Sequence, residues 1–448
     1  MFTAAGTHIL RGQVLAFKDD PFLTDPDQAV DFNADGAVVV EAGKIKRVGN
    51  ASAILRDAPQ LPVHHYPDDL IMAGFVDCHV HYPQAEVIAS YGEELLEWLH
   101  RYTFPAELKF ADTTYARRVA EQFLDDCLRN GTTTASVYAT THPQSVAEFF
   151  AAAEARDMCM ATGKVMMDRN APAGLLDTPQ TAYDQSKALL DTWHGRGRMT
   201  YVITPRFVVT STAEQLVAAA TLWREHPTAL MQTHIDENRN EIELARSLYP
   251  EASDYLNIYE QFGLIGSGSN FGHAIHLTDR EKAAFAATGS GISHCPTSNL
   301  FLGSGLMDLH GLRDGRRDIP VGLATDIGGG SSMSMLQTMR AAYEVARLCG
   351  YNLHPAKAFY LATLGSAQTM RLDTRIGNVR AGYDADLIVL DLNSTPAIKQ
   401  RMRHANDHWE ALFIQMIMAD DRAVRATYVH GRKAYERDDT AYASLQSQ

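Results

Sequence analysis

The stretch "IMAGFVDCHVH", residues 71 to 81, decides the fold prediction. It is an apolar, β-rich run that ends in His79 and His81, and residues two apart on a strand point to the same face of the sheet. Seven more β-rich runs follow before residue 370, and stretches with helical periodicity separate them. These runs are "TTTASVYA", "ATGKVMMD", "TYVITPRF", "ALMQTHI", "SNFGHAI", "SGISHCP" and "VGLATDI". Eight such units predict a (β/α)8 barrel, and a doubly wound open sheet is the competing α/β arrangement.

Polar side chains occupy the ends of these runs and favour the barrel over the open sheet. In a barrel, the C-terminal ends of all eight strands open onto one mouth, where active sites form. The side chains that follow the predicted strands in this way are His79, His81, Arg206, His234, His273, His294 and Asp326. We therefore expect them to gather at the barrel mouth.

The two ends of the chain predict a second, smaller domain. Residues 36 to 50 alternate around glycines as a hairpin does, and residues 382 to 392 and 425 to 436 do the same near the other end. Neither end alone has the three strands that independent stability requires, so we expect them to pair in one sheet. The predicted division is residues 1–70 and 376–437 for the small β domain, 71–375 for the barrel and 438–448 for a polar tail.

Composition narrows the classes of partner and the compartment. The chain has 448 residues and a formal net charge of −14, which argues against a nucleic-acid or anionic membrane partner. No run approaches the roughly 18 apolar residues of a membrane span, and the first residues lack the pattern of a signal peptide, so a cytoplasmic location is expected. The five cysteines have no C-x-x-C spacing, which makes a disulfide framework or a thiolate zinc site unexpected.

The strand-end histidines predict a metal site. If the barrel directs His79, His81, His234, His273 and Asp326 to one point, they form a set of imidazole and carboxylate ligands without a thiolate. That set favours zinc, with iron or manganese as alternatives. The fourth run has no lysine that could bridge two ions, so one metal is expected rather than two. The alternative is that the histidines only hydrogen-bond to backbone at the strand ends.

Glu237 is the candidate acid/base. It follows His234 by three residues, close enough to reach a water on the metal. A metal lowers the pKa of bound water towards about 7, and a nearby carboxylate can move the proton to a leaving group, which together predict hydrolysis. The alternative is a glutamate that the helix dipole stabilises. Asp326 could orient the hydroxide or merely cap a turn, and the glycines after it are predicted to let the backbone approach the site closely.

Several motifs resemble the amidohydrolase superfamily over nearly the whole chain. They are "DCHVH", "QTHIDEN", "GHAIHL", "SHCPTSN", "ATDIGGG" and the C-terminal "GYDADLIVLD". Within that superfamily, "LLEWLHRYTFPAE", "NGTTTASVYATTH", "GKVMMD" and "TPRF" resemble the guanine-deaminating branch. The resemblance implies a homodimeric enzyme of purine catabolism that hydrolyses guanine to xanthine and ammonia by means of a zinc-bound hydroxide.

The resemblance also implies roles for single residues. It places His79, His81, His234 and Asp326 on the metal, with His273 as a further ligand or a hydrogen-bond partner of the hydroxide. It assigns catalytic roles to Glu237, Asp326 and His273. It assigns purine binding to Gln84, Arg206 and Phe207. The paired N–H donors of an arginine guanidinium do match the O6 and N7 acceptors of guanine.

Each binding role has an alternative. Arg206 could be an ion-pair partner and Phe207 ordinary core. Trp98 and Phe104 line the pocket or pack a loop, and His294 supports the site or packs beside Cys295. The rival functions are an aminohydrolase acting on another base and a non-catalytic protein that has lost its metal.

Overall fold

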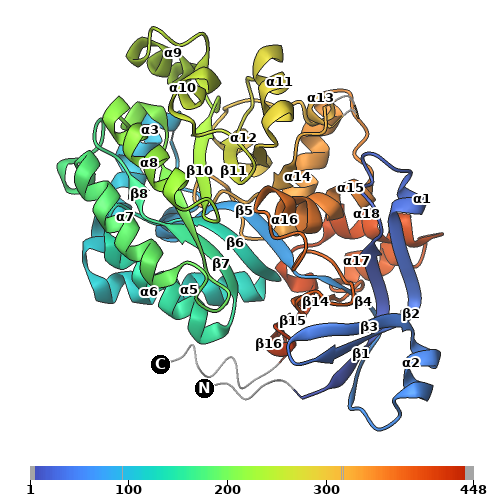
Figure 1. Cartoon of the computed structure of the whole chain (residues 1–448). Helices are drawn as coiled ribbons and strands as arrows, with labels where there is room; N and C mark the ends of the chain where they lie inside the picture. The colour runs from blue at the N-terminus through green and yellow to red at the C-terminus, as the bar shows by residue number, and fades with distance from the viewer. Residues whose placement is uncertain (1–5, 93, 314, 316, 439–448) are drawn as a thin grey trace.

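Parallel strands form the barrel that the β-rich runs predict. The computed structural model describes residues 6–92, 94–313, 315 and 317–438. Eight strands of this described part follow one another around the barrel, with helices outside them (Figure 1). They are β5 (Phe75–His81), β6 (Thr132–Tyr138), β7 (Cys159–Gly163), β9 (Thr200–Pro205), β10 (Leu230–Ile235), β11 (Ser269–His273), β12 (Gly291–His294) and β13 (Val321–Leu323), and the short β8 (Val165–Met166) pairs with β9. The predicted fold class is confirmed.

The barrel closes between its first strand and the segment after its last. The backbone N–H of Asp326 donates to the carbonyl of His79 at 3.0 Å, and that of His81 donates to Ile327 at 2.7 Å. Beneath them, the buried carboxylate of Asp77 accepts hydrogen bonds from the backbone N–H and the hydroxyl of Thr325. These bonds fix the two segments in a register that sets Asp326 beside both histidines of β5.

Helices cover the outside of the barrel. Pro143 begins α6, where its missing N–H costs nothing, and Thr278 and Glu281 form the capping box that starts α11. No helix of the described part is long and apolar enough to cross a membrane. The helices are α5 (Thr113–Arg129), α6 (Pro143–Arg156), α7 (Pro179–Trp193), α8 (Ala213–Glu225), α9 (Arg239–Leu248), α10 (Tyr255–Phe262), α11 (Asp279–Thr288), α12 (Pro296–Phe301), α13 (Leu309–Leu312), α14 (Met335–Leu348), α15 (Pro355–Tyr360) and α16 (Ser366–Thr369).

A longer excursion separates β5 from α5. It contains α3 (Leu95–Trp98), one π-helical turn (Leu99–Thr103) and α4 (Phe104–Leu108). Trp98 and Phe104 are both buried. The excursion therefore carries large apolar side chains towards the barrel mouth.

The chain termini build the second sheet, as predicted. Its order is β16, β15, β14, β4, β1, β2, β3, and the junction between the two ends is the antiparallel pair β4 and β14. The strands are β1 (His8–Phe17), β2 (Val30–Glu41), β3 (Lys44–Asn50), β4 (Val63–Ala73), β14 (Leu387–Leu390), β15 (Val424–Val429) and β16 (Arg432–Glu436), with the short helices α1 (Pro26–Ala29) and α2 (Ala51–Asp57). Strand β4 crosses the predicted boundary between residues 70 and 71, because residues 70 to 73 pair with β14. Two helices, α17 (Pro396–Met402) and α18 (His408–Met418), lie between β14 and β15, and α18 contacts α14 of the barrel.

A buried ion cluster joins this sheet to the bottom of the barrel. The Arg198 guanidinium, just before β9, contacts the carboxylates of Asp384 and Asp386, just before β14. All three side chains are buried. Lys44 and Arg375 add ion pairs to Asp384 from the surface side. Asp386 therefore depends on Arg198 for its opposite charge.

Replacing Arg198 is expected to destabilise the protein strongly. Arg198→Met should lower the free energy of unfolding by about 3–5 kcal/mol, because Asp386 would stay buried without its cation. Urea unfolding followed by circular dichroism measures the loss. Arg196→Met is the matched control, since Arg196 makes a bidentate but exposed pair with Glu154 and surface pairs contribute little. Equal losses in the two variants would contradict the role given to the buried cluster.

Candidate active site

Three histidines converge at the barrel mouth. His79 and His81 come from β5, and His234 comes from β10 on the opposite side of the barrel. One nitrogen of each ring lies within 4.8 Å of the others, and Nε2 of His81 is 3.2 Å from Nε2 of His234. Asp326, after β13, places Oδ1 at 3.4 Å from His79 Nε2 and 3.5 Å from His81 Nε2. The alternating H-x-H pattern thus aims both side chains into the mouth.

The hydrogen bonds around these rings leave nitrogens free for a cation. His234 Nδ1 lies 2.7 Å from the carbonyl oxygen of Arg206, so Nδ1 carries the proton and Nε2 offers a lone pair. Burial lowers the pKa of both His81 and His234 well below the usual value, which keeps the rings neutral. His79 Nε2 is buried and has no hydrogen-bond partner among the described residues. A buried nitrogen that has no hydrogen bond and lies 3.4 Å from a carboxylate oxygen, together with two facing imidazole nitrogens, fits a metal ion with N and O ligands.

His273 and Glu237 lie next to this group. His273 Nε2 is 3.4 Å from Glu237 Oε2 and 3.7 Å from Asp326 Oδ2. The other ring nitrogen, Nδ1, is 2.9 Å from Oδ1 of Asn299, which orients the imidazole. Burial raises the pKa of Glu237 to about 7, and the Ser304 hydroxyl donates to its Oε1 at 3.4 Å. Such a carboxyl group can take up and release a proton near neutral pH.

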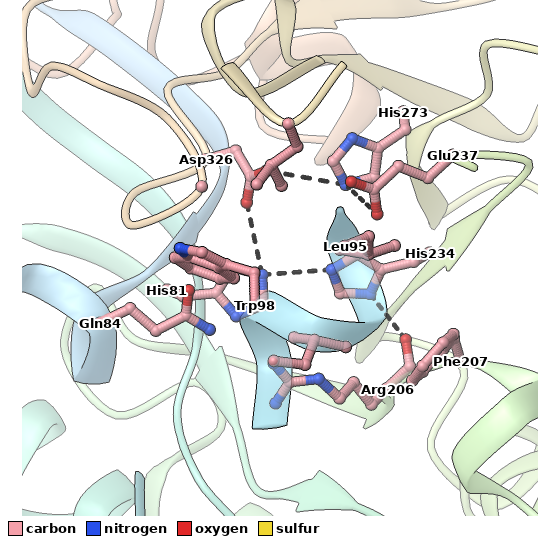
Figure 2. A pocket seen from close by; sticks show the side chains of 13 residues that line it. His81, Gln84, Leu95, Trp98, Arg206, Phe207, His234, Glu237, His273 and Asp326 are labelled. Carbon is pink, nitrogen blue, oxygen red and sulfur yellow. Dashed lines mark hydrogen bonds and ion pairs between the residues drawn. The ribbon is translucent and has the colours of Figure 1, made fainter. Parts of the chain in front are cut away.

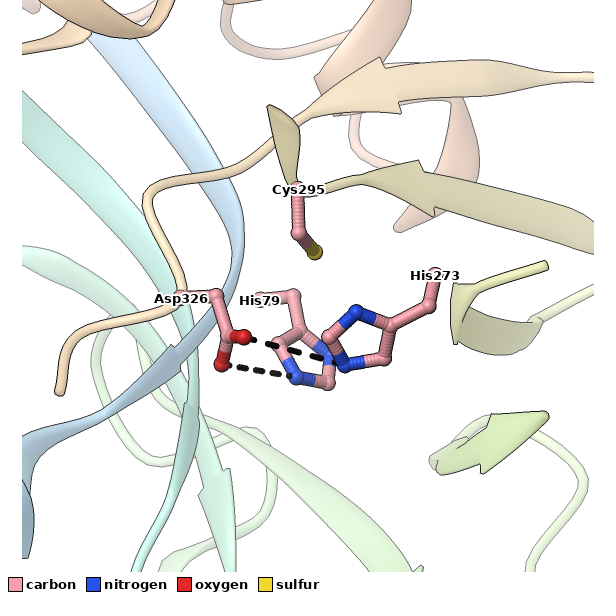
Figure 3. Close-up of side chains that lie close together, drawn as sticks. All are labelled: His79, His273, Cys295 and Asp326. Atoms are coloured by element: carbon pink, nitrogen blue, oxygen red, sulfur yellow. Dashed lines mark ion pairs between the residues drawn. The ribbon is translucent and has the colours of Figure 1, made fainter. Parts of the chain in front are cut away.

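Cys295 lies next to His79, His273 and Asp326 (Figure 3). Its sulfur and one ligand atom each of His79, His273 and Asp326 all lie within 4.8 Å of one another. Burial raises the pKa of the Cys295 thiol well above its usual value, and Sγ donates to the carbonyl of Ser293 at 3.4 Å. It therefore fits the description of a buried, protonated cysteine. Its neighbour His294 is buried, and neither ring nitrogen has a hydrogen-bond partner among the described residues, which favours the packing role over support of the site.

One cavity contains most of the predicted site residues (Figure 2). Its empty volume, with the open solvent at its mouth included, is about 400 Å³. Figure 2 shows Glu237, His273 and Asp326 on one side of it and Arg206 on the other. The lining residues are His81, Gln84, Leu95, Trp98, Leu99, Arg206, Phe207, His234, Glu237, His273, Leu302, Asp326 and Gly329. Phe104 is not among the lining residues, and the centroid of its ring lies 5.6 Å from Cζ of Arg206.

Glu107 at the Arg206 side of the cavity was not predicted. Its carboxylate oxygens lie 2.8 and 2.9 Å from Nη1 of Arg206, so Arg206 both lines the cavity and forms an ion pair. Glu107 is the last residue of the stretch "LLEWLHRYTFPAE", which also contains Trp98. An acidic residue in this pocket-forming stretch was the signal that could have indicated its role. Gln84 donates to Glu107 at 3.2 Å and accepts from the backbone N–H of Gly328 at 3.2 Å. A Cβ on Gly328 would lie 2.6 Å from the Gln84 carbonyl oxygen, which confirms the close backbone approach predicted for these glycines.

Comparison with known proteins decides the family. The model of the amidohydrolase family matches residues 70–434. The chain belongs to the amidohydrolase family. Members of this family are metal-dependent, in agreement with the donor set at the barrel mouth. The predicted resemblance and the prediction that the chain is an enzyme are both confirmed.

Individual relatives of this amidohydrolase are guanine deaminases. The "Guanine deaminase" of Escherichia coli (strain K12) is 44% identical over 97% of this chain and 100% of the relative. The solved structure of E. coli guanine deaminase superposes with a TM-score of 0.94, at 43% identity over 96% of this chain and 100% of that one. The guanine deaminase of C. acetobutylicum, solved with guanine bound in its active site, has a TM-score of 0.87 at 27% identity, over 96% of this chain and 100% of that one.

Proposed function

We propose that this amidohydrolase hydrolyses guanine to xanthine and ammonia. The observation that carries the proposal is a single cavity with two different sides. One side has the imidazole and carboxylate donors together with Glu237, and the other has Arg206 and Gln84. The guanine deaminases at 43–44% identity and the relative with bound guanine support this choice of substrate.

A single metal ion would be held by His79, His81, His234 and Asp326, with His273 as a further ligand or a hydrogen-bond partner beside it. Zinc suits these nitrogen and oxygen donors best, and iron is the alternative. When bound, the ion supplies Lewis-acid chemistry that makes water a better nucleophile near neutral pH. Two observations support this assignment: a hydrogen bond fixes the tautomer of His234, and Nε2 of His79 has no hydrogen-bond partner among the described residues.

The side chains move two protons during the reaction. Glu237 takes one proton from the attacking water and delivers it to N3 as the water oxygen adds to C2. The remaining hydroxyl proton then passes to the amino group through Glu237, with His273 and Asp326 next to it. The bond between C2 and the amino nitrogen breaks, ammonia leaves, and the water oxygen becomes the C2 carbonyl of xanthine.

The opposite side of the cavity binds the purine in this proposal. Nη1 of Arg206 is engaged by Glu107, whereas Nε and Nη2 take no part in that ion pair. These donors suit the O6 and N7 acceptors of guanine. Phe207 and Trp98 offer flat apolar surfaces to the ring, and Trp98 is anchored by a 3.1 Å hydrogen bond from Nε1 to the Ser90 carbonyl.

The direct test measures ammonia release and ultraviolet difference spectra with the zinc-loaded protein. The panel contains purines, pyrimidines and aminotriazines. Guanine is expected to turn over fastest, with xanthine as the product. If only a different base released ammonia, the substrate-binding roles given to Gln84, Arg206 and Phe207 would be wrong. If no base released ammonia, the proposal as a whole would be contradicted.

We further infer a homodimer in the cytoplasm that serves purine catabolism and binds no nucleic acid. The family resemblance supports the homodimer, and the net charge of −14 supports the exclusion of nucleic acid. Sedimentation equilibrium of the purified protein tests the oligomeric state. A monomer across the micromolar range would contradict the inferred dimer.

A further inference from the structure

One buried carboxylate contacts the two polar side chains, Gln84 and Arg206, that we propose to bind the purine. Glu107, on α4, is 0% exposed. Its two oxygens lie 2.8 and 2.9 Å from Nη1 of Arg206, and Oε1 also accepts from Nε2 of Gln84 at 3.2 Å. Glu107 does not line the cavity itself, so it acts on a ligand only through these two neighbours.

The contact between Glu107 and Arg206 fixes the orientation of the guanidinium group and neutralises its charge. Arg206 is 2% exposed, and a buried guanidinium needs an opposite charge, which Glu107 supplies. Cζ of Arg206 lies over the ring of Phe104, 5.6 Å from its centroid, and this cation–π contact favours the observed position of the guanidinium. The ion pair is neutral overall and still offers N–H donors, which favours an uncharged carbonyl oxygen over an anion as the bound group.

The contact with Gln84 fixes the orientation of its amide. Nε2 donates to Glu107, while Oε1 accepts from the backbone N–H of Gly328 at 3.2 Å. A half-turn of the amide would set its oxygen against the carboxylate and its NH2 against the N–H of Gly328. Two favourable contacts would become two repulsive ones, so the carboxylate decides which amide atom faces which neighbour.

We propose that Glu107 is a positioning residue that lets the cavity distinguish a 6-oxopurine from a 6-aminopurine. The inference rests on the proposed function. Guanine has an acceptor at C6 and an N–H at N1, whereas 2,6-diaminopurine has a donor at C6 and an acceptor at N1. Both carry the same 2-amino leaving group, so their comparison isolates the hydrogen-bond pattern that Glu107 sets. Sites built on such patterns reject the mismatched analogue strongly, because buried polar groups would stay unpaired.

The test compares wild-type and Glu107→Gln proteins with metal bound, using both purines as substrates. The ratio of kcat/KM for guanine to that for 2,6-diaminopurine is expected to fall at least about tenfold in the variant, mainly through a higher KM for guanine. Bound metal, measured by mass spectrometry, should be unchanged. Since both substrates are measured on one preparation, a loss of folded protein cancels from the ratio. An unchanged ratio, with both activities reduced alike, would overturn the proposal.

Two more variants keep the test decisive. Glu107→Asp retains the charge beside Arg206 but is too short to reach Gln84 as well, so the ratio should fall severalfold even if Glu107→Gln does not fold. Glu97→Gln is the control, because among the described residues Glu97 on α3 pairs only with Arg101, at the surface, and its loss should leave the ratio unchanged. If Glu107→Asp kept the wild-type ratio, the proposal would be wrong.

Failure of the role proposed for Glu107 can be distinguished from failure of the proposed function. If the wild-type protein released no ammonia from guanine, the proposed function would fail. Equilibrium dialysis of the two purines against the wild-type protein and the Glu107→Gln variant would then measure the same discrimination as a ratio of binding constants. Equal ratios in the two proteins would overturn the role of Glu107, and a lower ratio in the variant would support it.

Discussion

Glu237→Gln is expected to lower kcat for guanine by about 10²–10⁴-fold while the protein keeps its metal. The amide has the shape of the carboxylate but cannot take a proton from water. The substitution also leaves the histidine imidazoles and the Asp326 carboxylate of the donor set in place. Ammonia release measures the activity, and mass spectrometry of the purified variant measures the metal.

The matched control for Glu237 is on the following helix. Glu243 is exposed on α9, and Glu243→Gln should retain full activity. A Glu237→Gln variant that deaminated guanine at the wild-type rate would show that another group carries the proton. Loss of the metal together with activity would instead make Glu237 a ligand.

His234→Ala is expected to remove both the metal and the activity. His234 provides one of three imidazole nitrogens within 4.8 Å of one another, and its Nδ1 is held by a 2.7 Å hydrogen bond. Even the loss of such a supporting hydrogen bond weakens metal affinity by about 10–100-fold, so the loss of the ring should exceed that range. Titration with zinc, followed by metal analysis after dialysis, measures the affinity.

A histidine that does not line the cavity provides the control, because its replacement removes an imidazole without removing a proposed metal ligand. His226 directly follows α8 and does not line the cavity, so His226→Ala should bind metal and turn over guanine as the wild-type protein does. Stoichiometric zinc in His234→Ala would contradict the ligand assignment. It would leave His79, His81 and Asp326 as a sufficient set.

The barrel and the residues at its mouth were predictable because both follow from short-range patterns. Alternation places His79 and His81 on one face, and parallel strands bring their C-terminal ends together whatever the loop lengths. The same rule gathered His234, His273 and Asp326 from strands far apart in the sequence. The pairing of the two chain ends followed because neither could form a stable sheet alone.

What the sequence did not reveal depends on contacts between distant segments. Glu107 meets Arg206, Asn299 meets His273 and Ser304 meets Glu237 only in the folded chain. The backbone at two site residues is equally invisible in the sequence, since His273 and Asp326 have positive φ angles of 71° and 50°, which non-glycine residues rarely adopt. Helix α18 was missed because its run "HWEALFIQMIM" is apolar on nearly every side and has little helical periodicity to detect.

Arg206 contributes to both sides of the cavity, one through its side chain and the other through its main chain. Its guanidinium faces the proposed purine site, while its main-chain carbonyl holds His234. Every amino acid has that carbonyl, so a mutation at position 206 can change which molecule is bound without removing the hydrogen bond that orients the histidine. Substrate preference can therefore drift in evolution while the ion and the reaction are inherited unchanged.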